Sequence, residues 1–231
     1  MKKVPFRIGD SQIFAQVTER GDARLTMINL HEDEQTSVRA ARAVIQRNGG
    51  RFIELLHTGT RRVRFSLDGS DYSFDPNRIF TPAGIHNTLR GETISDQAYA
   101  AVAEFAEHFV RFFALSKQRS LIALHNNGDG GFSIHSYEVG SDREGDAARV
   151  HVDGSADPDD FYYVTDELVF ERLREQNFNV ILQSHHTVED DGSLSVYAGR
   201  SRVVYINVEA ENGHLEEQIR MLDVATRLLL E

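Results

Sequence analysis

The sequence predicts a layered α/β fold, and three observations favour it. Short apolar runs alternate with longer stretches of helical periodicity, the pattern of a sheet covered by helices. The 231 residues are enough to bury a sizeable core in one large domain or two small ones. The composition is 40% hydrophobic and 26% charged, which is ordinary for a globular protein. We find no internal repeat and no low-complexity block.

The first half of the sequence is expected to contain strands, a helix and a hairpin. The expected elements are, in order, a buried strand over 24–30 (RLTMINL), a helix over 35–47, a strand over 52–56 and a hairpin of 62–67 with 71–74. Asn48-Gly49-Gly50 ends the helix, because glycine readily takes the left-handed conformation that closes a helix.

The second half is expected to contain two long helices and three short buried strands. Ser95 can cap a helix whose apolar stripe has 3–4 spacing. The stripe consists of Tyr99, Val102, Ala106, Phe109 and Phe113. The expected strands cover 121–124 (LIAL, before His125), 180–182 and 203–208, and the last helix starts near Leu215.

One region of this half of the sequence has no helix or strand pattern. Residues 138–160 are rich in Asp, Gly and Ser, which predicts a loop excursion on the surface. A lid and a disordered loop are the alternatives. A solvated insertion is the preferred interpretation.

Charge and composition exclude several classes of protein. The formal net charge is 25 − 36 = −11, whereas nucleic-acid binding needs a basic footprint. The absence of Cys excludes disulfides, thiolate zinc fingers, iron–sulfur clusters and a cysteine nucleophile. No run approaches the ~18 apolar residues of a membrane span. MKKVPFRIGDSQ lacks the apolar core of a signal peptide, so we expect a cytoplasmic protein, although a chain trimmed of its leader would look the same.

Two histidines and a glutamate form the first candidate site. His31 follows the first buried strand, with Glu34 three residues on, and His125 follows LIAL. Open α/β sheets place ligands at the carboxyl ends of their strands, so we expect these side chains to meet there. Two imidazoles and a carboxylate leave the fourth position of zinc open for water, as catalytic sites require. Zinc would lower the pKa of that water towards ~7 and polarise a carbonyl.

Two other interpretations remain open at this point. The H-x-x-E spacing occurs by chance, and Glu34 could instead stabilise the start of the following helix, where an acid is favourable. Both roles are compatible. His185-His186, followed by acidic residues, could also bind a metal. Adjacent histidines on a strand point to opposite sides, however, so a solvated acidic loop is the preferred interpretation there.

A second group of residues suits carboxylate binding. In FDPNRIFT, Arg78 offers a rigid fork for a carboxylate, and Asn77 adds a side-chain donor on the same stiff turn. A surface turn with a solvated arginine is the alternative. The preceding TRRVRF supplies Arg61 at a loop end, with Arg62 and Arg64 on one face of a strand.

A third group of candidate residues lies on the expected strand VVYINVEAE. Tyr205, Asn207 and Glu209 share one face of this strand. A carboxylate at the end of an apolar strand invites a function, and near activated water Glu209 could act as general base and then proton donor. Glu211 has the same parity and is the rival. Both could also face solvent.

These motifs occur in one order over residues 24–211: H-x-x-E, T-R, D-x-N-R-x-F, an apolar strand ending in H-N, and a strand ending in Glu. The order resembles the zinc carboxypeptidase superfamily, including its aspartoacylase and succinylglutamate desuccinylase relatives. Five motifs in one order are far more specific than any one of them. The resemblance implies a zinc-carboxypeptidase-like (phosphorylase/hydrolase-like) fold, three-layer α/β/α with a central mixed β-sheet. It also implies a single catalytic domain over residues 1–231.

The resemblance implies roles on the matching positions. One Zn²⁺ per chain would be bound by His31, Glu34 and His125. Asn77 and Arg78 would hold the substrate carboxylate, and Asn126 of the H-N pair is taken as a further substrate-binding residue. The implied catalytic residues are Arg61, which polarises the carbonyl, and Glu209, the base.

Three departures from the family pattern carry expectations of their own. Glu32 stands where the acylases usually have glycine and is expected to crowd or acidify the zinc site. Pro76 replaces the usual leucine and is expected to shift the Asn-Arg turn. The chain ends about one helix after Glu209, so we expect no C-terminal β-domain and a more open cleft. The loop tyrosine of the family has four candidates, Tyr137, Tyr162, Tyr163 and Tyr197.

The expected function is a zinc-dependent, metallocarboxypeptidase-like hydrolase that cleaves an amide bond next to a substrate carboxylate. The partner is then a small peptide, with no nucleic acid and no membrane. One alternative is an N-acyl amino acid deacylase that uses the same groups. Another is a non-catalytic module that binds metal or peptide.

Overall fold

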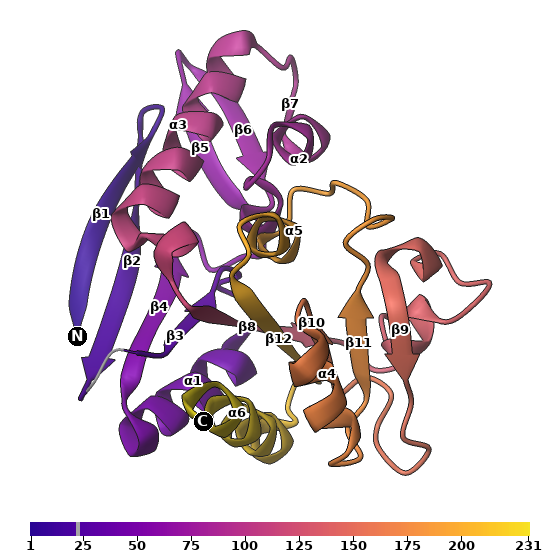
Figure 1. Cartoon of the computed structure of the whole chain (residues 1–231). Coiled ribbons are helices and arrows are strands. Elements are labelled where there is room, and N and C mark those ends of the chain that lie inside the picture. The colour runs from indigo at the N-terminus through magenta and orange to yellow at the C-terminus, as the bar shows by residue number, and fades with distance from the viewer. Residues whose placement is uncertain (22–23) are drawn as a thin grey trace.

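The computed structural model describes residues 1–21 and 24–231 and has a mixed β-sheet of nine strands at its centre (Figure 1). The strand order is β1-β2-β4-β3-β8-β12-β10-β11-β9. Adjacent strands are parallel in β4-β3-β8-β12 and in β10-β11, and antiparallel elsewhere. The strands are β1 (Lys2–Ile8), β2 (Ser11–Arg20), β3 (Thr26–Asn29), β4 (Gly50–Leu56), β8 (Ser120–Asn127), β9 (Ala147–His151), β10 (Phe161–Val164), β11 (Val180–Gln183) and β12 (Val204–Glu211).

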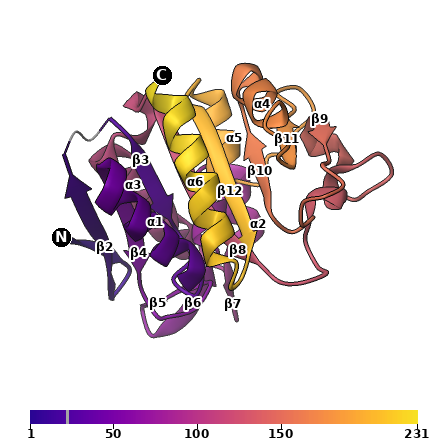
Figure 2. The same cartoon turned by 90° about the horizontal axis from the view of Figure 1, so that it is seen from below.

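Helices cover both faces of this sheet. The helices are α1 (Gln35–Asn48), α2 (Pro82–Thr88), α3 (Asp96–Phe113), α4 (Glu167–Arg174), α5 (Leu194–Arg200) and α6 (Leu215–Leu230). Apolar side chains of α1, α4 and α6 share one core with one face of the strands, and those of α3 and α5 share a second core with the other face. Figure 2 shows α1 and α6 lying across the sheet. The predicted three-layer α/β/α class with a mixed central sheet is therefore confirmed.

A second, three-stranded sheet extends the core beside α3. It is formed by β5 (Val63–Leu67), β6 (Ser70–Phe74) and β7 (Arg90–Gly91), all antiparallel. Its inward side chains join the core of α3, and the rings of Phe74 and Phe105 lie 5.9 Å apart. The sheet leads into a 3₁₀ turn, η1 (Pro76–Arg78), which carries the Asn-Arg pair. The hairpin therefore delivers this pair to the central sheet.

The longer predicted elements agree with the structure. The helix expected over 35–47 is α1, which Gly49 ends at φ 77°. Ser95 caps α3 by accepting from the backbone N–H of Ala98, and the predicted stripe is buried except for Tyr99, which is partly buried. The strand expected over 24–30 is shorter, covering Thr26–Asn29.

Two regions differ from the sequence expectation. The N-terminal segment forms the hairpin of β1 and β2, although the alternation that buries Val4, Phe6 and Ile8 is visible in the sequence. The segment over 138–160 is more than a loop, because β9 lies within it and pairs antiparallel with β11. As the edge strand, β9 has no fully buried residue, which hides it in a polar sequence.

None of the helices in the described part of the chain is long and apolar enough to cross a membrane.

Candidate metal centre and its cavity

The candidate residues meet where parallel strands end. His31 follows β3, Glu34 immediately precedes α1, and His125 lies near the end of β8. In the parallel pairing of β12 with β8, Glu209 stands opposite His125. The predicted convergence at the carboxyl edge of the sheet is therefore observed.

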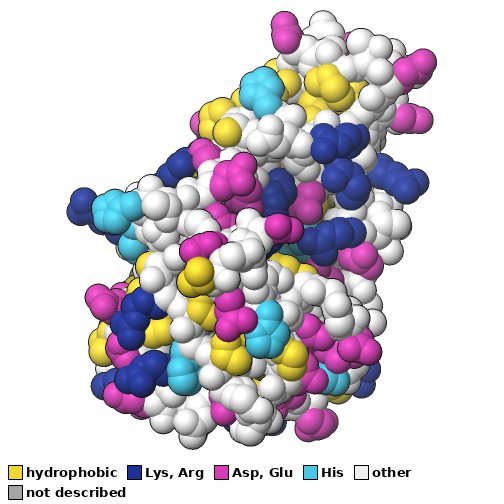
Figure 3. Space-filling view, turned by 90° about the vertical axis from the view of Figure 1, so that its right-hand side faces the viewer, with side chains coloured by type: hydrophobic (Ala, Val, Ile, Leu, Met, Phe, Trp, Pro, Cys, Tyr) yellow, Lys and Arg dark blue, Asp and Glu magenta, His cyan; other side chains and the backbone are white. Residues whose placement is uncertain are grey.

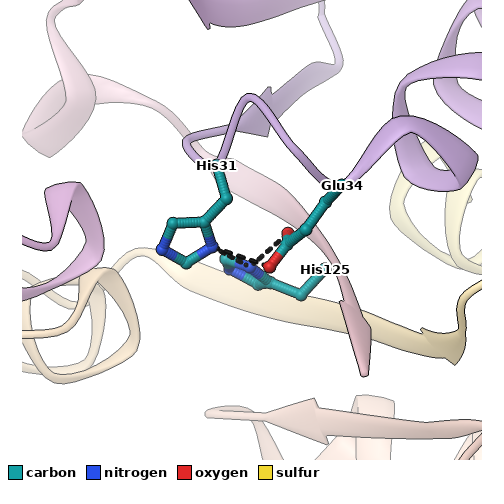
Figure 4. A group of neighbouring side chains, drawn as sticks. All are labelled: His31, Glu34 and His125. Carbon is teal, nitrogen blue, oxygen red and sulfur yellow. Dashed lines mark hydrogen bonds and ion pairs between the residues drawn. The ribbon is translucent and has the colours of Figure 1, made fainter. Parts of the chain in front are cut away.

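Three side chains point at one another at this edge (Figure 4). The Nδ1 atom of His31 lies 2.8 Å from Oε1 of Glu34 and 3.1 Å from Nδ1 of His125. The Nδ1 atom of His125 lies 3.0 Å from Oε2 of Glu34. All three residues are buried. Glu34 stands at the N-cap of α1, but its side chain makes no capping hydrogen bond, because it faces the histidines.

The donor set fits zinc. Tetrahedral zinc with bonds of about 2.0–2.1 Å holds its ligand atoms roughly 3.3 Å apart, close to the separations above. Two ring nitrogens that face each other beside a carboxylate leave a position between the three groups that a cation can occupy. This group of His31, Glu34 and His125 could therefore hold a metal ion.

Asp75 orients the first histidine. Its Oδ1 lies 2.8 Å from Nε2 of His31 and also accepts from the backbone N–H of Asn77. A carboxylate on the far nitrogen of a metal-binding histidine fixes the tautomer and the ring orientation. This arrangement leaves Nδ1 of His31 facing Glu34 and His125 as a potential ligand atom.

The local charges suit a cation. Burial lowers the pKa of His31, but the Glu34 and Asp75 carboxylates outweigh burial and raise this pKa to about 9. Burial raises the pKa of Glu34, but His125 and His31 outweigh it and hold this pKa well below its ordinary value. The site therefore favours a positive charge on or between the imidazoles and an ionised carboxylate beside them.

A cavity of about 380 Å³ opens over this group. Among the described residues, its lining includes all but one of the predicted site residues. Those lining residues are Glu34, Arg61, Asn77, Arg78, His125, Asn126 and Glu209. The exception, His31, is fully buried.

The structure distinguishes between the two candidate bases, Glu209 and Glu211. Glu209 lines the cavity and accepts from Nδ2 of Asn207 at 3.1 Å. Burial raises its pKa, although His125 acts in the opposite direction. The cavity lining does not include Glu211. Its backbone N–H donates to Asp160, and its carboxylate lies 3.4 Å from Nε2 of His214.

The two predicted arginines in the cavity lining, Arg61 and Arg78, are held by carboxylates. Nη1 of Arg61 donates to Glu34 at 2.8 Å, and its Nε lies 3.6 Å from Asp75. Nη1 of Arg78 donates to the carbonyl of Asn77, and its Nε lies 3.4 Å from Asp191. Both side chains keep part of their surface exposed, Arg61 more than Arg78.

The side-chain amides of the two predicted substrate-binding asparagines, Asn77 and Asn126, make most of their hydrogen bonds within the protein. Oδ1 of Asn77 accepts from the backbone N–H of Leu194, which turns Nδ2 towards Nε2 of His125 at 3.3 Å. If Nδ1 of His125 held a metal, the ring proton would be on Nε2 and would face the amide donor of Asn77, so this contact would have to shift. Asn126 donates to Ala210 and Gln218 and accepts from the backbone of Ser37. Substrate binding by either asparagine stays a prediction.

Glu32 does not crowd the metal centre. Its carboxylate turns towards the loop before Arg61, where Oε2 accepts from the backbone N–H groups of His57 (2.6 Å) and Gly59 (2.7 Å). The expectation that Glu32 crowds the zinc site is therefore wrong, because backbone donors attract its carboxylate away. That Glu32 acidifies the site stays a prediction. Pro76 opens η1 at a position where proline fits, since its missing N–H has no partner there.

Several lining residues have no distinctive signal in the sequence. Tyr137 and Tyr163 line the cavity, and so does Tyr205, which was not among the four predicted tyrosines. Arg143 and Asp146 come from the segment expected as a surface excursion. The sequence around Arg143 and Asp146 is polar and Gly-rich, so nothing in it indicates that this segment forms a wall of the cavity.

The alternative histidine pair is not part of a metal-binding group in the described part of the chain. Nε2 of His185 lies 3.0 Å from the carbonyl of Thr165. Asp190 instead pairs with Arg200. On the face drawn in Figure 3, acidic side chains are scattered among basic ones.

No family model matches this chain, and no curated protein matches it. Among solved structures, product-bound cell shape determinant protein Csd4 from Helicobacter pylori matches with a TM-score of 0.52 at 12% identity, over 94% of this chain and 55% of that one. Apo Csd4 matches with a TM-score of 0.50 at 13% identity, over 94% and 54%. A succinylglutamate desuccinylase/aspartoacylase from Rhodobacter sphaeroides gives 0.48 at 14% identity, over 95% and 58%.

At these identities the matches show the fold alone. The fold is the zinc-carboxypeptidase-like one that the order of motifs predicted. The chain spans little more than half the length of these three structures.

Proposed function

We propose that this protein is a zinc-dependent hydrolase that cleaves an amide bond next to a substrate carboxylate. One observation carries the proposal: the facing side-chain atoms of His31, Glu34 and His125 lie 2.8–3.1 Å apart, pair by pair, beside a cavity that also presents Arg78 and Glu209. Metal ligands, an anion-binding group and a buried carboxylate together are the groups that such a reaction requires.

His31, Glu34 and His125 would hold the zinc. Bound zinc in such a site supplies Lewis-acid chemistry, activating water and polarising a carbonyl. Three protein ligands leave room for both, as in other catalytic zinc sites.

Glu209 would move the proton. Its burial raises its pKa, so its carboxylate accepts a proton more readily than an exposed glutamate does. It stands opposite His125 in the strand pairing, on the cavity side of β12. From there it would take the proton of the attacking water and return it to the leaving amine.

Arg78 would bind the substrate carboxylate. In the structure its Nε lies 3.4 Å from Asp191, a longer distance than that of a good charge-assisted hydrogen bond. A substrate carboxylate can replace this loose contact with two parallel hydrogen bonds. Arg61, about half exposed, would turn from Glu34 towards the carbonyl oxygen.

A deacylase acting on N-acyl amino acids would use the same groups. The two substrate classes differ in which side of the scissile amide carries the extended part. We favour the peptide, because the cavity is lined by charged groups of both signs, including Arg143 and Asp146. A binding module without catalysis would have no use for a buried carboxylate such as Glu209.

The test compares three substrates on zinc-loaded protein. These are a short peptide with a free C-terminus, the same peptide amidated, and an N-acyl amino acid. We expect release of the C-terminal amino acid from the first peptide and much slower turnover of the amidated one. Turnover of the N-acyl amino acid alone would replace the peptidase with the deacylase, and no turnover of any substrate would refute the proposal.

The Glu209→Gln variant tests the chemical role. General acid–base groups contribute about 10²–10⁴-fold, so kcat should fall by at least ~10²-fold while one zinc stays bound. Glu216→Gln, an exposed position in the first turn of α6, is the matched control and should keep full activity. Unchanged kcat in the Glu209 variant would remove Glu209 from the mechanism.

A further inference from the structure

We propose a second cation site, of calcium-like chemistry, formed by Asp129, Asp159 and Glu211 beside the catalytic cavity. Asp129 lies in the loop after β8, Asp159 just before β10, and Glu211 ends β12. These three segments lie far apart in sequence. The site stands two residues beyond His125 and Glu209 along β8 and β12, and it does not depend on the proposed hydrolase function.

The geometry fits one ion. One carboxylate oxygen from each of the three residues lies within 4.8 Å of those of the other two. Calcium binds oxygens at about 2.3–2.6 Å, so two ligands of one calcium ion lie at most about 5 Å apart. A single calcium ion can therefore reach all three carboxylates.

A buried oxygen without a partner points to the ligand. Asp159 is only 4% exposed. Its Oδ2 accepts from the backbone N–H of Gly130 at 3.1 Å, but its Oδ1 is buried and has no hydrogen-bond partner. A buried carboxylate is costly unless it is paired or coordinates a metal. A cation at this place would satisfy it.

Asn127 offers a second oxygen of this kind. Its Nδ2 donates to the carbonyls of Asp159 (2.7 Å) and Phe132 (3.1 Å), which fixes the orientation of the amide. Its Oδ1 is then left buried without a partner. Asn127 pairs with Glu211 in the strand register, so this amide lies among the proposed ligands. Amide and carboxylate oxygens are typical calcium ligands.

The local charge also calls for a cation. Asp157 and Asp160 flank Asp159, which brings the acidic residues here to five. His214 forms ion pairs with two of these five carboxylates, those of Asp160 and Glu211. The described part of the chain shows no ion pair for the other three. Like charges in such numbers repel, and one divalent ion would offset this repulsion.

The all-oxygen set separates this site from the histidine centre. Zinc favours imidazole nitrogen, whereas carboxylates and amide oxygens suit calcium. The loop between β8 and η3 (Ile134–Tyr137) also contributes Gly128 and Phe132 to the cavity lining. A bound ion would therefore hold one wall of the cavity in place.

The test titrates CaCl₂ into chelator-treated protein reloaded with one zinc, followed by calorimetry. We expect one calcium per chain and a Tm that rises by about 5–10 °C at a calcium concentration 100 times Kd. Asp159→Asn should abolish this binding and keep the zinc. His31→Ala should lose zinc and keep calcium, which distinguishes this site from the metal centre of the proposed hydrolase.

Two further variants keep the proposal falsifiable. Asp129→Asn, at an exposed loop position that leaves folding intact, should weaken calcium binding at least tenfold. Asp142→Asn, an exposed residue of the segment over 138–160, is the control and should bind like the parent protein. Absence of calcium binding, equally tight binding of MgCl₂, or unchanged binding in both Asp159→Asn and Asp129→Asn would overturn the proposal.

Discussion

At the residue scale, two carboxylates outside the proposed ligand set support the candidate metal centre and the loop beside it. Asp75 holds Nε2 of His31, and Glu32 holds the loop before Arg61 through two backbone N–H groups. The sequence predicted the two histidines and Glu34, because each follows or precedes a strongly patterned element. It could not predict what Asp75 and Glu32 contact, because those partners become neighbours only in the folded chain.

Asp75→Asn should weaken zinc binding by about 10–100-fold, the usual effect of removing a carboxylate from behind a metal-binding histidine. The amide still fills the space but no longer increases the basicity of the ring. Competition with a chromogenic chelator measures the affinity. Asp68→Asn, an exposed residue of the neighbouring hairpin turn, should bind zinc normally. An affinity for zinc in the Asp75 variant equal to that of the parent would show that this contact does not support the ligand.

Glu209→Gln should stabilise the metal-free protein at neutral pH. Burial raises the pKa of Glu209 in the folded state, so its ionisation costs the folded protein stability above that pKa. The folded state regains this stability as the pH falls through the raised pKa towards the ordinary value of about 4.3. Glutamine cannot ionise, so it removes this cost and the variant should be the more stable protein above the raised pKa.

Thermal unfolding from pH 4 to pH 8 measures this effect. The variant should exceed the parent in Tm at pH 7, and the difference should shrink towards pH 4. A difference that grows as the pH falls would mean that the pKa of Glu209 is lowered instead.

At the scale of elements, a close contact between glycines places the Asn-Arg turn. A Cβ on Gly84, in α2, would lie 2.2 Å from Cα of Gly192 and 2.5 Å from the carbonyl oxygen of Arg78. Gly192 itself has φ +76° and an equally close contact with Arg78. The short helix α2, the turn η1 and the loop before α5 therefore fit together only with glycine at both positions.

Gly84→Ala should cost about 1–3 kcal/mol, as overpacking does in a close-packed interior. It should also raise KM more than it lowers kcat, because the backbone of Arg78 has to move. Denaturant unfolding and steady-state kinetics measure the two effects. Gly154→Ala is the control, because nothing lies within 4 Å of a Cβ there and φ is not positive. A Gly84 variant as stable as this control would show that the contact relaxes freely.

Long, strongly patterned elements were the predictable ones. The stripe of α3 and the apolar run of β8 each carry enough periodic positions to stand out. The helices α2 and α5 have seven residues each, too few for a periodic stripe. Edge strand β9 is stabilised by its pairing with β11 rather than by burial, so its sequence resembles a loop.

At the scale of the whole molecule, the candidate metal ligands and the candidate base lie together at one edge of the sheet. The ends of β3, β8 and β12 bring together residues that lie up to 178 positions apart, from His31 to Glu209. The order of motifs along the sequence predicted this edge because the fold fixes which strands are neighbours. The residues that the segment over 138–160 contributes to the cavity, such as Arg143, could not be predicted, because no pattern shows where a polar segment folds back.

Zinc content after dialysis, measured by elemental analysis on the parent and on His125→Ala, decides whether His31, Glu34 and His125 form a metal centre. We expect about one zinc per chain in the parent, less than a tenth of that in the variant, and about one in a His185→Ala control. Zinc binding should also raise the Tm of the parent by about 5–10 °C at 100 times Kd. A parent that binds no zinc after reconstitution, or a His125 variant that retains it, would contradict the assignment of these three residues as ligands.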